Sequence, residues 1–86
     1  MHRREFFALP DMQINPGDRI WIFGTNEIAR SYFEQICTRY GEHVVNGFIE
    51  TLGQPAKYMG KKVFSLSEKL EIGERDKFLV AALNLR

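Results

Sequence analysis

Arg19 to Gly41, with the sequence RIWIFGTNEIARSYFEQICTRYG, is the most informative part of the chain for the fold. Its first part, Arg19 to Phe23, is rich in β-branched and aromatic residues without alternation, which is typical of a strand buried on both faces of a parallel sheet. From Asn26 to Tyr40 apolar residues instead recur every three to four positions, and polar residues fill the opposite face. This part of the chain therefore predicts a buried strand followed by an amphipathic helix of about four turns.

The ends of this helix carry ordinary start and stop signals. Thr25 or Asn26 can cap its first amides, because both side chains offer an oxygen acceptor. Gly41 stands where a left-handed C-cap is expected.

Downstream, the sequence predicts a second strand, a loop, a third strand, a short helix and a fourth strand. The capping box Ser65–Glu68 opens the short helix and Gly73 ends it. The strands are expected at 44–50, 62–64 and 78–83, and the loop at 51–60. Residues 1–18 form a lead-in segment that ends in the turn Asn15–Asp18, and 19–86 form one domain.

This element order predicts an α/β fold. Long crossovers return the chain to parallel strands, and right-handed crossovers give a four-stranded, mostly parallel sheet with the order 3-2-1-4. Helices on both faces would make a small Rossmann-like domain of three layers. Because such domains normally continue after the fourth strand, we expect either part of a larger protein or two copies that pack their sheets together.

Composition narrows the classes of function. The 86 residues hold 12 Lys and Arg against 11 Asp and Glu, a formal charge of +1, which argues against a nucleic-acid partner. No apolar run approaches the roughly 20 residues of a membrane span. One cysteine, Cys37, excludes an internal disulfide and favours a reducing compartment. Arg3 and Arg4 are not followed by the apolar stretch of an export signal, so we expect a cytoplasmic protein.

Polar groups follow the predicted strands where an open α/β sheet binds its ligands. The turn Gly24-Thr25-Asn26-Glu27 follows the first strand, Glu50 ends the second, and Asn84 follows the last. Backbone amides at the start of the helix suit an anion or polar group, and an acidic side chain at the second strand suits ribose hydroxyls. We expect these six residues to surround one ligand-binding crevice.

The turn departs from the dinucleotide fingerprint G-x-G-x-x-G/A. Asn26 replaces the glycine that lets the backbone approach a pyrophosphate, although Ala29 is an allowed third position. The Glu27 carboxylate would repel a second anion at the helix start. Tight NAD(P) binding is therefore disfavoured.

The stretches RIWIFGTNEIARSYFEQI, VVNGFIE, GKKVFSLSEKL and KFLVAALN together resemble a known module. They are similar to the Rossmann-like N-terminal domain of bacterial sugar-modifying enzymes, among them nucleotide-sugar acyltransferases and polysaccharide-biosynthesis dehydratases and epimerases. The resemblance covers about three quarters of the chain, from Arg19 to Asn84. It implies that the domain holds the nucleotide part of a nucleotide sugar. It matches Gly24, Thr25 and Asn26 to the glycine-rich turn, Glu50 to the acidic strand end and Asn84 to the polar residue after the last strand.

Each candidate also has a simpler interpretation. Gly24 can serve only as a tight strand-to-helix turn, Glu50 only as a solvated strand end, and Asn84 only as a turn former. Cys37 lies on the apolar stripe of the helix, where a buried, inert thiol is expected. His2 and His43 have no spaced partners, so the sequence predicts neither a metal site nor a general base.

No set of nucleophile, base and orienting group can be assembled, so catalysis within these residues stays an open question. The sequence favours a nucleotide- or nucleotide-sugar-binding module associated with carbohydrate or cell-surface polysaccharide biosynthesis. Its partners would be a small nucleotide ligand and a second copy or an attached catalytic domain. Two alternatives remain, a degenerate Rossmann-like interaction domain that binds no ligand and a fragment of an NAD(P)-dependent oxidoreductase.

Overall fold

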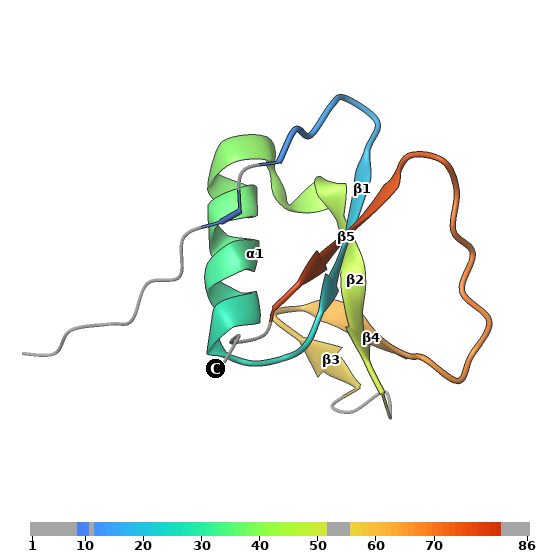
Figure 1. Ribbon diagram of the computed structural model, residues 1–86. Helices are drawn as coiled ribbons and strands as arrows, with labels where there is room; N and C mark the ends of the chain where they lie inside the picture. The colour runs from blue at the N-terminus through green and yellow to red at the C-terminus, as the bar shows by residue number, and fades with distance from the viewer. Residues whose placement is uncertain (1–8, 11, 52–55, 82–86) are drawn as a thin grey trace, which may run out of the picture.

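The structure is a computed structural model, which describes residues 9–10, 12–51 and 56–81. It contains one α-helix, one 3-10 helix and five strands in these residues (Figure 1). In chain order they are β1 (Arg19–Phe23), α1 (Glu27–Tyr40), η1 (Glu42–Val44), β2 (Val45–Glu50), β3 (Lys57–Tyr58), β4 (Lys61–Ser65) and β5 (Asp76–Val80).

The strands form one mixed sheet with the order β3-β4-β2-β1-β5. β1 pairs in parallel with β2 and β5, β2 pairs in parallel with β4, and only β3 is antiparallel to its neighbour β4. The α/β class and the mostly parallel sheet are confirmed, but strand count and order differ in detail from the predicted four strands. The difference is β3, which lies inside the expected loop.

A tight hairpin explains β3. Met59 and Gly60 both adopt positive φ, 52° and 81°, so that the chain reverses between β3 and β4 within two residues. Two-residue hairpins favour such a turn, because its twist matches that of the flanking strands. Methionine is an uncommon residue in this conformation, and the sequence signal for the turn is correspondingly weak.

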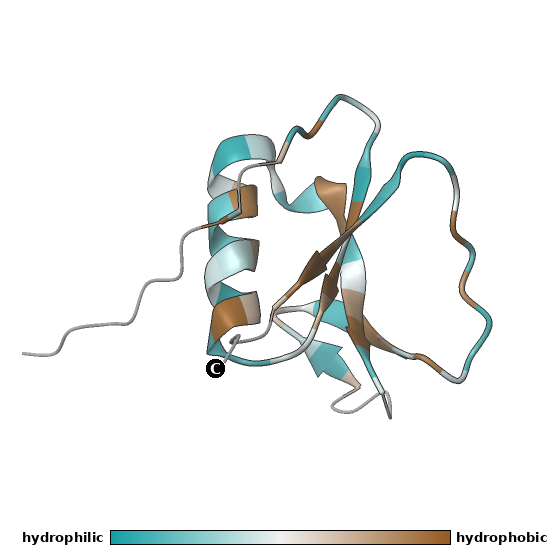
Figure 2. Cartoon of the chain, in the orientation of Figure 1, coloured by the Kyte–Doolittle hydropathy of each residue, from teal (hydrophilic) through white to brown (hydrophobic). Residues whose placement is uncertain are grey.

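Helix α1 confirms the predicted amphipathic pattern. Its cap is Asn26, whose side-chain Oδ1 accepts a hydrogen bond of 2.9 Å from the Ala29 amide. The helix ends at Gly41, where φ is 98° and the amide donates to the carbonyl oxygens of Ile36 and Cys37. The apolar stripe of α1 faces the sheet, while teal, hydrophilic residues cover its other side (Figure 2).

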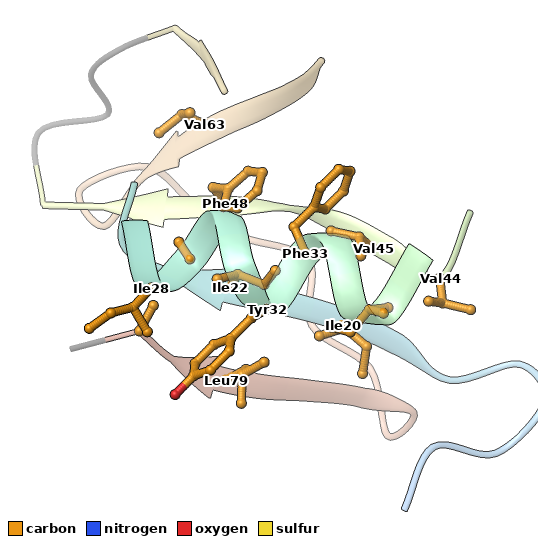
Figure 3. Packing of buried hydrophobic residues seen from close by; sticks show 13 residues of the cluster. Ile20, Ile22, Ile28, Tyr32, Phe33, Val44, Val45, Phe48, Val63 and Leu79 are labelled. Atoms are coloured by element: carbon orange, nitrogen blue, oxygen red, sulfur yellow. The ribbon is translucent and has the colours of Figure 1, made fainter. Parts of the chain in front are cut away.

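The main core lies between α1 and one face of the sheet, as Figure 3 shows. Ile20 and Ile22 of β1 are fully buried beneath the helix. Phe48 of β2 is fully buried as well, and its ring centroid lies 5.7 Å from that of Phe33 and 5.1 Å from that of Tyr58. Phe48 therefore joins the helix, the central sheet and the β3–β4 hairpin in one contact network.

The opposite face of the sheet carries a second, smaller aromatic cluster. The ring of Trp21 lies 5.0 Å from that of Phe64 and 6.2 Å from that of Phe78. Gly47 permits this arrangement, because a Cβ at that position would meet the Phe64 ring at 2.7 Å. In the described part of the chain no helix covers this face, so the described residues form two layers rather than the predicted three.

The predicted second helix does not form. Ser65 and Glu68 do make the capping contact, in which the Ser65 amide donates to Glu68 Oε2 at 2.8 Å. The contact closes only a turn, and residues 66–75 contain turns and irregular backbone. Leu66, Leu70 and Ile72 are the apolar residues there, and their spacing makes no continuous helical stripe that could be buried.

None of the helices in the described residues is long and apolar enough to cross a membrane.

The turn before β1 is held by the buried carboxylate of Asp18, as the Asn15–Asp18 pattern predicts. Asp18 Oδ2 accepts from the Asn15 amide at 2.8 Å and pairs with the Lys77 ammonium at 2.8 Å. The Asp18 side chain is only 5% exposed. The hydrogen bond from Lys77 and then that from Asn15 lower the pKa of Asp18 below its ordinary value of 3.8.

This pair predicts a loss of stability in acid. Because the folded-state pKa of Asp18 is the lower one, its contribution is complete above 3.8 and disappears as the pH falls through the folded-state value. We expect Asp18→Asn to lower the melting temperature at neutral pH and to flatten its decline in acid. Thermal melts recorded from neutral pH down to below 3.8 test the expectation, with Glu74→Gln as the control. Parallel profiles for Asp18→Asn and the wild type would contradict it.

Candidate functional site

The candidate site is the end of the sheet where the parallel strands β1, β2 and β5 finish. Gly24 continues from β1 and donates its amide to the Ile49 carbonyl at 2.8 Å. Ala81 follows β5 and donates to the Phe23 carbonyl at 2.9 Å. The turn at 24–27, the end of β2 and the end of β5 therefore lie together, because carboxyl ends of parallel strands share one edge. Asn84 lies outside the described residues.

Glu50 and Thr25 form the first contact within the site. The Thr25 hydroxyl donates to Glu50 Oε2 at 2.6 Å. Among the described residues Glu50 makes no ion pair, although it is half-buried at the tip of β2. Thr25 thus orients a carboxylate whose charge no described side chain balances.

Asn26 forms the second contact, between the turn and the end of β5. Its Nδ2 donates to the Ala81 carbonyl at 2.9 Å, while its Oδ1 caps the Ala29 amide. The Asn26 side chain therefore crosses the gap between β1 and β5, where the strand order reverses. A dinucleotide-binding turn keeps a glycine at this position for the pyrophosphate. Here the amide group of Asn26 fills that place with two internal hydrogen bonds.

Glu27 places its charge on the exposed side of the helix start and forms no hydrogen bond with Thr25 or Glu50 in the described part of the chain. Its carboxylate pairs with Arg30, which also reaches Glu34 at 3.5 Å. The Glu27 side chain is largely exposed. This negative charge interacts favourably with the helix dipole. It also lies beside the backbone amides that a bound anion would use, and it would repel that anion.

Tyr58 belongs to the site and was missed in the sequence. The hairpin places it against the turn, so that its hydroxyl donates to the Asn26 carbonyl at 3.0 Å. Burial, followed by the charges of Glu27 and Glu34, raises the pKa of Tyr58 above 10.0, so the hydroxyl keeps its proton at neutral pH. Only the Met59–Gly60 turn brings Tyr58 here, and the sequence offered no strong signal for that turn.

The described residues offer neither a cluster of metal ligands nor an activated thiol. No group of three or more His, Cys, Asp or Glu side chains there is arranged to hold a metal ion. Cys37 is a free thiol on the buried side of α1. Burial and the nearby charge of Glu42 raise its pKa above 9.0, which keeps the thiol protonated.

Together these contacts define a small α/β domain with acidic and polar side chains at the carboxyl end of a mostly parallel sheet. No family model, no curated protein and no solved structure matches the chain.

Proposed function

We propose that this domain binds the nucleoside part of a nucleotide or nucleotide sugar at the carboxyl end of its sheet. Its cellular role would be in carbohydrate or cell-surface polysaccharide biosynthesis, beside an attached or partner catalytic domain. One observation carries the proposal: the Glu50 carboxylate, oriented by Thr25, has no cationic partner among the described residues and lies at the tip of the strand next to β1.

The geometry of Glu50 suits a hydroxyl-rich ligand. In Rossmann folds an acidic side chain at the end of the second strand accepts hydrogen bonds from ribose. Oε2 of Glu50 accepts from Thr25, and Oε1 is the oxygen for a ribose hydroxyl. Because Thr25 fixes the carboxylate in one orientation, less side-chain entropy would be lost on binding.

The phosphate side of the ligand would lie against the turn at 24–27 without entering it. Asn26 occupies the place of a deeply bound pyrophosphate, and Glu27 adds a negative charge nearby. The amides at the helix start still favour a polar or anionic group. This arrangement therefore favours one ligand over another. A nucleotide sugar bound mainly through its nucleoside fits the turn better than a tightly bound NAD(P) does.

A ligand titration tests the proposal. UDP, a UDP-sugar, NAD and acetyl-CoA would each be added while the amide shifts of residues 24–28 are followed. We expect UDP or the UDP-sugar to bind, and Glu50→Gln to weaken binding about tenfold, because a hydrogen bond to a charged group is lost. Asn26→Gly should strengthen the phosphate contact by opening the turn.

Glu71→Gln is the matched control, since Glu71 lies in the irregular segment before β5. It should leave affinity unchanged. Shifts with NAD alone would favour the oxidoreductase alternative, and unchanged affinity in both Glu50→Gln and Asn26→Gly would remove the crevice from consideration.

A second candidate function is an interaction domain that binds no small ligand. Two observations favour it: Asn26 closes the gap between β1 and β5 with its own hydrogen bonds, and β5 exposes Phe78 by 44% and Val80 by 63%. An apolar edge strand of this kind favours pairing with a second copy. If no ligand changes the amide shifts at millimolar concentration, and sedimentation shows a dimer that depends on protein concentration, this second function would be supported over the first.

A further inference from the structure

A cavity of about 550 Å³ lies at the opposite end of the sheet from Glu50. One wall is the segment Ile14–Arg19, which leads into β1. The other wall is formed by Arg39 and Tyr40 of the last turn of α1 and by His43 and Val44 of η1. In Figure 1 the blue segment before β1 arches beside the end of α1 that continues into η1. The volume falls within the roughly 300–1,000 Å³ that is usual for small-molecule sites.

Most charges around this cavity are already balanced. The Asp18 carboxylate pairs with Lys77 at 2.8 Å. The Arg19 guanidinium pairs with Asp76 through bonds of 2.7 and 3.0 Å. Arg39 is different, because it forms no ion pair with any described residue. Of the charged residues that line the cavity, Arg39 is therefore the one left without a carboxylate partner among the described residues.

The position at the end of α1 modifies this charge without reversing it. A helix C-terminus carries a partial negative charge of about half an elementary unit, smaller than that of the guanidinium. The Gly41 amide also donates to the carbonyl oxygens of Ile36 and Cys37. His43, which lines the same cavity, offers a second nitrogen donor beside Arg39.

The remaining wall is apolar. Val44 is buried, Ile14 is half-buried, and the Tyr40 ring is partly exposed at the cavity. A small inorganic ion would leave these apolar surfaces exposed to water, whereas a flat or branched carbon body would bury them. Orienting polar groups beside apolar walls are the usual composition of a small-molecule pocket.

We propose that this cavity binds a small organic anion, an aromatic carboxylate or phosphate monoester. Arg39 and His43 hold the anionic group, and the carbon body packs on Tyr40, Ile14 and Val44. The site is separate from the proposed ligand site at Glu50 and does not depend on the function proposed for that site.

Phenyl phosphate and benzoate are the probes, and the amide shifts of the folded chain are the readout. At least one of them should cause saturable shifts in residues 14–19 and 39–44, and the tighter probe identifies the anion class. Inorganic phosphate, which lacks the ring, and benzylamine, which reverses the charge, should each bind about tenfold more weakly or worse.

Arg39→Gln should weaken the better probe about tenfold, because it removes a charge-assisted hydrogen bond. Arg30→Gln is the matched control on the same helix, since Arg30 is paired with Glu27 and Glu34, and should leave affinity unchanged. An unperturbed spectrum outside the cavity would show that Arg39→Gln still folds. Equal binding of benzylamine, no effect of Arg39→Gln, or shifts confined to residues 24–28 would each overturn the proposal.

Discussion

Replacing Phe48 by alanine is expected to lower the free energy of unfolding by about 3–5 kcal/mol. The side chain is fully buried, and its ring packs against Phe33 of α1 and Tyr58 of the hairpin. Its removal takes away apolar burial and leaves a cavity that three separate elements would have to collapse to fill. A domain of this size has a total stability of about 5–15 kcal/mol, so much of it would be lost.

Urea unfolding followed by tryptophan fluorescence measures the effect through Trp21, which lies on the opposite face of the sheet. The matched control is Phe78→Ala, which removes the same side chain from a position that is 44% exposed. Its loss should be clearly smaller, because less apolar area returns to water. If both variants lose the same free energy of unfolding, the packing of Phe48 against the helix and the hairpin does not contribute the stability expected of it.

Gly24→Ala is expected to cost about 2–4 kcal/mol, the sum of backbone strain and crowding. Gly24 has a φ of 117°, which side chains rarely adopt. A Cβ there would lie 3.0 Å from the Ala81 carbonyl oxygen and 3.4 Å from Asn26 Nδ2. The new methyl group would therefore press on the hydrogen bond that joins the turn to the end of β5.

Two other glycines separate the causes. Gly60 has a φ of 81°, but a methyl group added there would meet no described atom within 4 Å, so Gly60→Ala tests strain alone and should cost about 1–2 kcal/mol. Gly73 has neither a positive φ nor a near neighbour among the described atoms, and Gly73→Ala should be close to neutral. Thermal unfolding of the three variants measures their stabilities, and we expect Gly24→Ala to be the least stable and Gly73→Ala the most stable. A Gly24→Ala loss no greater than that of Gly60→Ala would show that the contact with Ala81 is not tight.

The Gly24 result also bears on function. If this glycine is needed for the Asn26–Ala81 contact, its presence is explained by packing without any ligand, which is the simpler interpretation of the turn. A nucleotide site would then depend on Glu50 and Thr25, whose hydrogen bond does not involve Gly24. Stability and ligand affinity measured on the same variants thus separate a structural turn from a binding turn.

Part of the candidate site was predictable because it follows from parallel pairing. Once the strands ending at Phe23 and Glu50 are parallel, Thr25 and Glu50 must finish at the same edge, and they meet at 2.6 Å. The bridge from Asn26 to Ala81 was not predictable, since its partners lie 55 residues apart and the acceptor is a backbone carbonyl. The cavity beside Arg39 was missed for a similar reason: its two walls are a turn and a helix end with no shared motif.

Local patterns in the chain were sufficient to define β1, α1, β2 and the turn at Asn15–Asp18, because periodicity, capping and turn chemistry depend on neighbouring residues. Long-range packing was needed to make residues 57–58 a strand and to leave the Ser65–Glu68 capping contact as a turn without a helix. Both outcomes have one cause. A short segment takes the conformation in which its backbone and apolar groups find partners, and β4 supplied them for β3 while no described element buried a helical face on 66–72.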